Sequence, residues 1–211
     1  NTRVDVGTIY CIVRNYVKHI RELGNDEHAE PVLFLKPAAS LITQTRQIEL
    51  PVYSEDVHHE TELVLLIGRE GRNITEADAL HHITGVGIGL DLTARDTQTA
   101  LREKGLPWTI SKGFETAACV SDFLPLQRLG DPGKLRFRLC VNGEPRQEGD
   151  SSLMIFSVSK IVSYISSVVT LQPGDLIFTG TPHGVARICP GDRLDLSLED
   201  ILHATFTVAE S

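Results

Sequence analysis

The fold of this chain is decided by residues 58–67, whose sequence is His-His-Glu-Thr-Glu-Leu-Val-Leu-Leu-Ile. A β-strand turns successive side chains to opposite faces, so Glu60 and Glu62 point to the same face and can bind one cation together. The residues from Leu63 to Ile67 are apolar at every position, which predicts a strand buried on both faces. Unpaired carboxylates are expensive in such surroundings, and a shared cation would relieve that cost. The stretch therefore predicts a central strand that carries half of a metal site.

A second apolar run, residues 85–91, is rich in glycine and ends at Asp91. It predicts a second strand whose last carboxylate completes the site. Three hard oxygen ligands suit Mg²⁺ or Mn²⁺ better than zinc. The pattern alone leaves two alternatives open, a solvated strand end for the two glutamates and a helix N-cap or turn residue for Asp91.

The composition predicts one well-packed globular domain, residues 1–211. Hydrophobic residues make up 41% of the chain and charged residues 23%, and the net charge is -8. This charge leaves no basic surplus for phosphates, so we expect neither nucleic acid nor a membrane as partner. No apolar run reaches the ~20 residues of a membrane span.

The four cysteines lie far apart without CxxC spacing, which predicts buried thiols in a reducing compartment and a cytoplasmic protein.

Short strands and a few short helices are predicted along the rest of the chain. Residues 94–104 predict a helix that Gly105 ends, and Asn142-Gly143 predicts a type I′ hairpin. Residues 32–35 predict a short buried run, whereas residues 14–23 are polar and compatible with a helix in a mobile flap. Further predicted elements are strands at 8–13, 134–141, 175–179, 193–198 and 204–208, and a helix from Ser157, its N-cap, to about Val169. The predicted class is α+β, with strands predominant.

Other residues suit catalysis or binding, although each has an ordinary structural explanation. His19 and Glu22 share one face of a helix, so Glu22 could orient the imidazole for taking a proton from water. Two charged residues on a solvated flap would give the same pattern. Lys112 is by pattern more often a surface lysine. The loop 179–184 offers backbone amides and the Thr181 hydroxyl to a carboxylate, although a plain turn is equally compatible.

The histidine pairs at 58–59 and 81–82 are set aside as metal ligands, because neighbouring side chains diverge on a strand and on a helix.

Taken together, these segments resemble the fumarylacetoacetate hydrolase family, and within it the short single-domain acylpyruvase-like members. The resemblance covers almost the whole chain, and eight motifs occur in register. They are Arg14-Asn15-Tyr16-x-x-His19, Lys36-Pro37, His59-Glu60-x-Glu62, Asp91-x-Thr93-x-Arg95-Asp96, Lys112-x-Phe114, Asn142-Gly143-Glu144, Met154-Ile155-Phe156, and Pro173-Gly174-Asp175 to Thr179-Gly180-Thr181-Pro182.

The resemblance implies a highly twisted mixed β-roll with a few short helices, a homodimer, and one Mg²⁺ or Mn²⁺. It places a mobile lid near residues 14–28. The positions implied to bind metal are Glu60, Glu62 and Asp91, those implied to be catalytic are His19, Glu22 and Lys112, and those implied to contact substrate are Arg14, Arg95, Gln98 and Thr181. Val13 stands where the family commonly has glycine, and its side chain could alter the lid and the range of substrates.

The activity implied is hydrolysis of a C-C bond in an acylpyruvate, a 2,4-diketo acid, with release of pyruvate. Oxaloacetate decarboxylation is implied as an additional activity. In both reactions a divalent ion chelated by the 2-keto acid would act as a Lewis acid and stabilise the enolate, beside the charge of Lys112.

Two alternatives stay open. One is an isomerase or tautomerase of unsaturated 2-hydroxy dioic acids such as 2-hydroxyhepta-2,4-dienedioate, or an oxaloacetate tautomerase. The other is a member that binds keto acids without turnover, which only Val13 favours.

Overall fold

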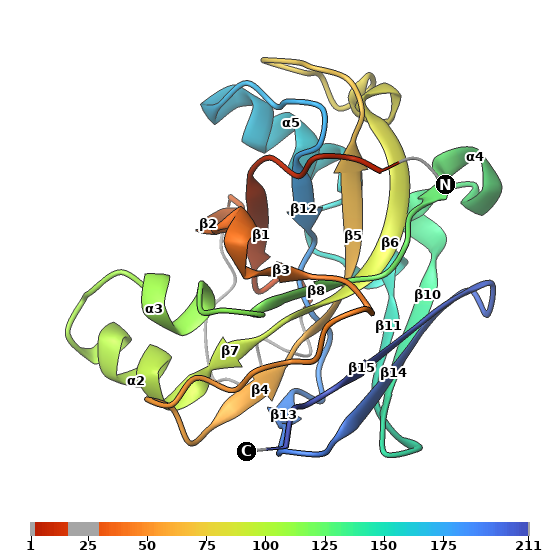
Figure 1. Ribbon diagram of the computed structural model, residues 1–211. Coiled ribbons are helices and arrows are strands. Elements are labelled where there is room, and N and C mark those ends of the chain that lie inside the picture. The colour runs from red at the N-terminus through yellow and green to blue at the C-terminus, as the bar shows by residue number, and fades with distance from the viewer. Residues whose placement is uncertain (1–2, 17–29, 211) are drawn as a thin grey trace.

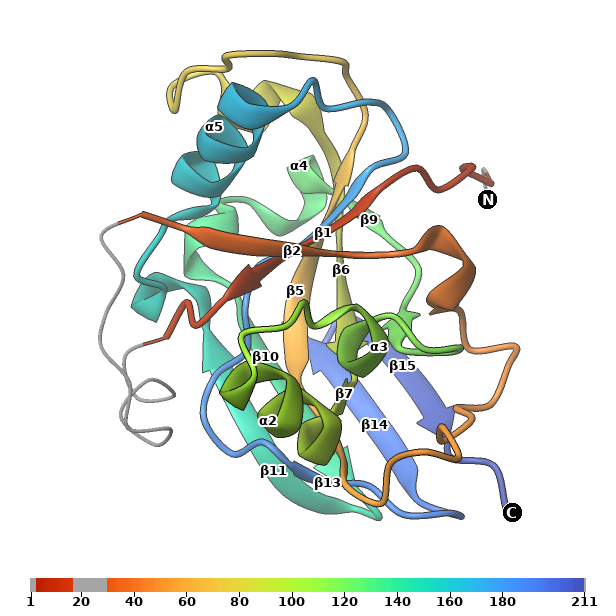
Figure 2. The same cartoon turned by 90° about the vertical axis from the view of Figure 1, so that its left-hand side faces the viewer.

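The computed structural model describes residues 3–16 and 30–210, and these residues form a mostly β structure (Figures 1 and 2). Their strands build three sheets, of eight, four and three strands. The largest has the order β2-β1-β12-β5-β6-β8-β3, with β9 also paired to β6, and it mixes parallel with antiparallel neighbours. The smaller ones are β11-β10-β14-β15 and β13-β4-β7. The predicted class, predominantly β with a few short helices, is confirmed.

The strands have the following bounds: β1 Ile9–Val13, β2 Val32–Lys36, β3 Leu41–Ile42, β4 Val57–His59, β5 Thr61–Ile67, β6 Ile83–Asp91, β7 Thr93–Ala94, β8 Ala118–Val120, β9 Leu124–Pro125, β10 Arg136–Val141, β11 Glu144–Asp150, β12 Leu176–Phe178, β13 Ala186–Arg187, β14 Arg193–Leu198 and β15 Leu202–Thr207.

The helices of the described residues are short. They are α2 Arg95–Glu103, α3 Thr109–Lys112, α4 Leu126–Leu129 and α5 Val158–Val168, with single 3-10 turns η1 Ala38–Ser40, η2 Ala79–His82, η3 Pro132–Lys134 and η4 Ser151–Leu153. In both views α5 lies at one end of the molecule and α2 at the other. Over the described ranges, none of these helices is long and apolar enough to cross a membrane.

The antiparallel pair of β5 and β6 forms the centre of the largest sheet. Every residue of β5 is buried, as the uninterrupted apolar run predicts. The two faces of β5 pack into two different hydrophobic cores. Leu63 and Leu65 pack into the larger one, whereas Val64 and Leu66 pack into a smaller one with Phe178. Because both faces are covered by protein, the carboxylates at the start of β5 also lie inside the molecule.

Glycine in β6 permits the close approach of a neighbouring strand. A Cβ atom added to Gly89 would lie 2.4 Å from the carbonyl oxygen of Cys119 in β8, the strand that pairs with this end of β6. A side chain at this position would push β8 away. The glycine-rich run is therefore a packing requirement of the strand that ends in Asp91.

Several local signals of the sequence are confirmed. The Ser157 hydroxyl accepts a hydrogen bond from the Lys160 N–H at the start of α5, 3.1 Å between the heavy atoms. Gly105 follows α2 with φ +65°. Asn142 and Gly143, with φ 53° and 83°, join β10 to β11 in the left-handed conformation that a type I′ turn requires.

Two burial predictions are wrong. The run 32–35 forms β2, which lies at one edge of its sheet among the described residues, and Val32 is 40% and Leu35 51% exposed. All four cysteines are free thiols, yet Cys189 is exposed and Cys140 only half-buried.

Candidate active site

Glu60, Glu62 and Asp91 meet at one end of the β5–β6 ladder. The register pairs Thr61 with Leu90, and the Asp91 N–H donates to the carbonyl oxygen of Glu60 at 2.8 Å, so Asp91 lies opposite Glu60. Opposite residues of an antiparallel pair share a face, as do residues two apart on one strand. All three side chains are buried, and one carboxylate oxygen from each lies within 4.8 Å of the others.

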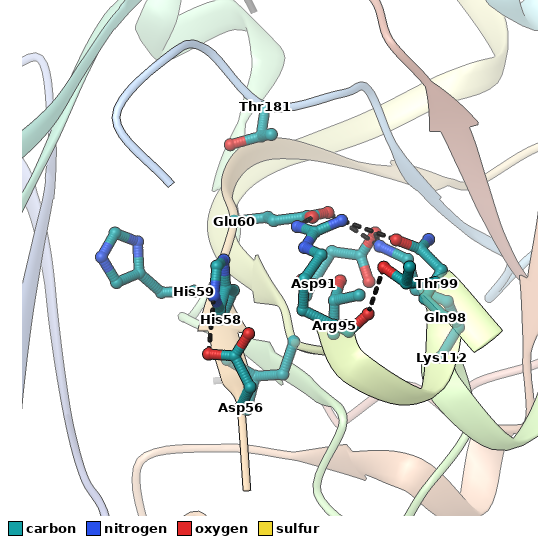
Figure 3. Close-up of polar contacts among 12 residues, drawn as sticks. Asp56, His58, His59, Glu60, Asp91, Arg95, Gln98, Thr99, Lys112 and Thr181 are labelled. Carbon is teal, nitrogen blue, oxygen red and sulfur yellow. Dashed lines mark hydrogen bonds and ion pairs between the residues drawn. The ribbon is translucent and has the colours of Figure 1, made fainter. Parts of the chain in front are cut away.

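Three cationic side chains surround these carboxylates. Figure 3 shows two of them, Arg95 and Lys112, beside Glu60 and Asp91. Lys112 Nζ lies 2.7 Å from Glu60 Oε2 and 2.8 Å from Asp91 Oδ2. Arg95, the first residue of α2, forms an ion pair with Glu60, and Lys36 Nζ lies 2.7 Å from Asp91 Oδ1. Two of the three carboxylates are thus held by cations of the protein.

Glu62 differs from the other two. Among the residues that the structure describes it has no ion pair, and its Oε2 accepts a hydrogen bond from the Gly180 N–H at 2.6 Å. Burial raises the pKa of Glu62 well above the ordinary range, and the charges of Asp91 and Glu60 add to the effect. A buried carboxylate beside two others, with hard oxygen donors, fits a Mg²⁺ or Mn²⁺ ion. Glu60, Glu62 and Asp91 would hold it.

Lys112 is buried, so the surface alternative is wrong for this residue. Burial opposes its charge, but Asp91 and Glu60 outweigh burial and raise its pKa. Its Nζ also lies 4.8 Å from the centroid of the Phe34 ring. Lys112 is therefore a fixed positive charge among the carboxylates.

A cavity of about 140 Å³ opens in front of the carboxylates. It is smaller than the ~300 Å³ at which typical drug-sized ligand pockets begin, so it suits a small molecule. The residues that line it are Ile12, Val13, Arg14, Phe34, Glu60, Glu62, Asp91, Arg95, Gln98, Thr99, Arg102, Trp108, Lys112 and Thr181.

The structure brings together most residues that the sequence assigns to the site. Arg14, Arg95, Gln98 and Thr181 all line the cavity with the three carboxylates and Lys112. The Arg95 guanidinium donates to Gln98 Oε1 at 2.6 Å, which orients both side chains. His19 and Glu22 lie outside the described residues, so the dyad stays a prediction.

Lys36 and Asn15 occur in motifs of the sequence but receive no role there. Lys36 is fully buried, and a lysine that ends an apolar run is the signal that could have identified it. Asn15 is also buried, and its Nδ2 donates to the carbonyl oxygens of Thr179 and Phe156 at 2.9 and 3.0 Å. Asn15 thereby fixes the strand end that precedes Gly180.

Gly180 cannot be replaced without strain. Its φ is +99°, and an added Cβ would lie 2.6 Å from the Asn15 Cβ. The same residue directs its N–H at Glu62. The Thr-Gly-Thr-Pro sequence is therefore part of the site, because its glycine lets the backbone approach a candidate metal ligand.

Comparison with known proteins assigns the chain to a family. The family model "Fumarylacetoacetate (FAA) hydrolase C-terminal" matches residues 8–209. The chain belongs to the fumarylacetoacetate hydrolase family. The resemblance in the sequence motifs is thereby confirmed over nearly the full length, and members of this family are enzymes with hydrolase, isomerase and decarboxylase activities.

Relatives within the fumarylacetoacetate hydrolase family carry different activities in their names. The mitochondrial oxaloacetate tautomerase FAHD1 of Rattus norvegicus is 43% identical over 203 residues, which are 96% of this chain and 92% of the relative. A mitochondrial oxaloacetate decarboxylase of Dictyostelium discoideum is 44% identical over 184 residues, 87% of this chain and 84% of the relative.

A solved structure of the family contains a metal ion and a ligand. Fumarylpyruvate hydrolase from Pseudomonas aeruginosa, in complex with Mn²⁺ and pyruvate, matches with a TM-score of 0.95 and 36% identity, covering 100% of this chain and 93% of that chain. A divalent ion is therefore compatible with this fold, and the buried acidic cluster of the present chain offers a place for one.

Proposed function

We propose that this protein is a divalent-metal-dependent enzyme that acts on short 2-keto acids. The reaction we place first is hydrolysis of an acylpyruvate with release of pyruvate, and oxaloacetate decarboxylation would use the same site. The observation that carries the proposal is the set of three buried carboxylates whose oxygens lie within 4.8 Å of one another, at the end of a small cavity.

The residues of the cavity divide into those that hold a cation and those that hold substrate. When bound by Glu60, Glu62 and Asp91, Mg²⁺ or Mn²⁺ supplies Lewis-acid stabilisation of the negative charge that develops on a keto oxygen. Lys112 stays protonated beside them and adds a second positive charge. Arg95 and Gln98, joined by their hydrogen bond, orient the substrate carboxylate.

Hydrolysis also requires an activated water. We assign this step to His19, oriented by Glu22, which would take a proton from water as it attacks the distal carbonyl. The C-C bond then breaks, its electron pair moves to the keto-acid fragment, and a proton delivered to that carbon gives pyruvate. The segment 14–28 would act as the lid that excludes bulk water.

Oxaloacetate tautomerase is the second candidate, and isomerisation of an unsaturated 2-hydroxy dioic acid belongs to the same reaction class. The name of the rat relative favours it, at 43% identity. Tautomerisation moves a proton between carbon and oxygen and needs no attacking water. It would therefore use the carboxylates, Lys112 and Arg95 without the His19 dyad.

A substrate panel with product identification tests the proposal. The purified protein is given acetylpyruvate, oxaloacetate and 2-hydroxyhepta-2,4-dienedioate with Mg²⁺ or Mn²⁺. Release of pyruvate and acetate from acetylpyruvate is the expected result, whereas conversion that conserves the carbon count supports the tautomerase or isomerase. Tight ligand binding without any product would support a protein that binds keto acids without turnover. It would contradict both enzymatic candidates.

Three further properties belong to the same proposal. We expect a homodimer, residues 1–211 acting as one catalytic domain, and a cytoplasmic location based on the cysteine pattern. Light scattering checks the first. Cell fractionation checks the last, since the rat and Dictyostelium relatives are named mitochondrial.

A further inference from the structure

The loop from Thr179 to Pro182 is held at its two ends by two buried side-chain amides. At the first end, Asn15 Nδ2 donates to the Thr179 carbonyl oxygen at 2.9 Å. At the second end, Gln147 Nε2 donates to the Pro182 carbonyl oxygen at 3.0 Å. Between them lie Gly180, which contacts Glu62, and Thr181, which lines the cavity.

Gln147 comes from β11 in the four-stranded sheet and is 1% exposed. Its Nε2 donates to Thr181 Oγ1 at 2.9 Å as well as to Pro182. Its Oε1 accepts from the Thr61 N–H at 3.0 Å and pairs with His59 Nδ1 at 2.9 Å. A side-chain amide has two donor hydrogens and two acceptor lone pairs, so every hydrogen-bonding position of Gln147 is used.

These contacts also fix the tautomer of the His59 imidazole. Because Gln147 Oε1 can only accept, His59 Nδ1 carries the proton. The Thr61 N–H can only donate and the Pro182 carbonyl oxygen can only accept, so the amide of Gln147 is held in one orientation, with its Nε2 directed at Thr181.

The hydrogen of the Thr181 hydroxyl is committed to this network. The hydroxyl accepts from Gln147 and donates to the Thr61 carbonyl oxygen at 2.9 Å, so its single hydrogen is not available to a ligand. Figure 3 shows this hydroxyl turned away from the side on which Arg95 and Lys112 lie. The Thr181 backbone N–H has no acceptor within the described part of the chain and is the donor left for a ligand.

We propose that Gln147 is a positioning residue: by holding the Thr181 hydroxyl, it presents the Thr181 N–H to the carboxylate of a 2-keto acid. The identity of the ligand rests on the proposed function. The side-chain amides of Asn15 and Gln147 then have different roles in positioning the loop. Asn15 holds the end at which Gly180 contacts the candidate metal ligand Glu62, and Gln147 holds the end that contacts substrate.

The test compares metal binding with ligand binding. Mn²⁺ affinity is measured by calorimetry without ligand, and pyruvate affinity is measured on the Mn²⁺-saturated protein. We expect Gln147→Leu to weaken pyruvate binding about tenfold, the loss of one hydrogen bond in a buried site, with Mn²⁺ affinity changed less than about twofold. In turnover assays the same variant should raise KM and retain kcat.

Matched variants make the comparison specific. Gln147→Met is close in length to glutamine and also removes the donors for Thr181 and Pro182, so it should weaken pyruvate binding in the same way. It also serves if the leucine variant does not fold. Gln47→Leu is the control, because exposed Gln47 likewise donates to a threonine hydroxyl, Thr207 at 3.2 Å, away from the site. It should leave both affinities unchanged.

Two results would overturn the proposal. One is unchanged pyruvate affinity in both Gln147 variants. The other is an equal loss of Mn²⁺ and pyruvate affinity, which would make Gln147 a general support of the fold. Absence of turnover in the wild-type protein, with the pyruvate effect preserved, would instead refute the proposed function and leave the role of Gln147 standing. Wild-type protein with Mn²⁺ that binds neither pyruvate nor oxalate would refute both.

Discussion

Lys36 Nζ lies 2.7 Å from Asp91 Oδ1, and the two side chains are 0% and 2% exposed. Removing one partner of a buried ion pair typically costs about 3 kcal/mol or more, and without Lys36 only Lys112 would balance the charge of Asp91 among the described residues. We therefore expect Lys36→Met to lower the free energy of unfolding of the metal-free protein by about that amount. Urea unfolding measures the change.

Mn²⁺ should restore much of the stability lost in Lys36→Met, because a divalent cation compensates Asp91 in place of the lysine. Lys134→Met is the matched control. Lys134 pairs with Asp131 at 3.4 Å but is 78% exposed, so its loss should cost less than about 1 kcal/mol. Equal losses in both variants would contradict the inference that burial makes the Lys36 pair important.

Glu62 predicts how the stability of the metal-free protein depends on pH. Its folded-state pKa is raised, so the folded protein binds a proton more tightly than the unfolded chain does. Stability should therefore fall as the pH rises above about 4.3, the ordinary pKa of glutamate, toward the raised value. Unfolding in urea with EDTA, at a series of pH values, measures this slope.

Glu62→Gln should flatten that slope and weaken Mn²⁺ binding at least about tenfold, because the amide offers no negative charge to the ion. Glu49→Gln removes an exposed carboxylate and should change neither property. An unaltered slope in Glu62→Gln would show that another group titrates.

Gly180→Ala tests the close approach of the loop to Asn15. The positive φ alone should cost about 1 kcal/mol, and the 2.6 Å contact with the Asn15 Cβ should add to it. Because Gly180 donates to Glu62, Mn²⁺ affinity should fall as well. Gly191→Ala is the control, since Gly191 has φ +82° but open space around its Cβ. It should lose stability without losing Mn²⁺ affinity.

His19→Ala tests the water-activating step. Loss of a general base should reduce acetylpyruvate hydrolysis about 100-fold or more. Mn²⁺ affinity and the decarboxylation of oxaloacetate should be preserved, since neither needs an attacking water. Unchanged hydrolysis would remove His19 from the mechanism.

The sequence predicts the carboxylates of the site because their arrangement follows from local rules. Period two along a strand puts Glu60 and Glu62 on one face, and a second apolar strand delivers Asp91. The roles of Lys36 and Gln147 depend instead on which distant strands become neighbours. Gln147 in particular lies in a polar segment with no apolar pattern, and only the packing of β11 against the start of β5 buries it.

The error in β2 has a similar cause. An apolar run predicts burial only if other elements cover both faces of the strand, and which elements cover a strand is not a local property. Val32 and Leu35 are exposed on β2, although both belong to an apolar run. The outward position of Cys189 depends likewise on the path of a loop.

The ion pairs around the three carboxylates bring the cluster close to electroneutrality. Arg14 and Arg102 also line the cavity, so a divalent ion added to the cluster would leave a surplus of at least two positive charges, which a dianion offsets more fully than a monoanion. Binding of a keto diacid should then decline more steeply with ionic strength than binding of a monocarboxylic acylpyruvate. The charge of a ligand would then affect its affinity more strongly than its shape does.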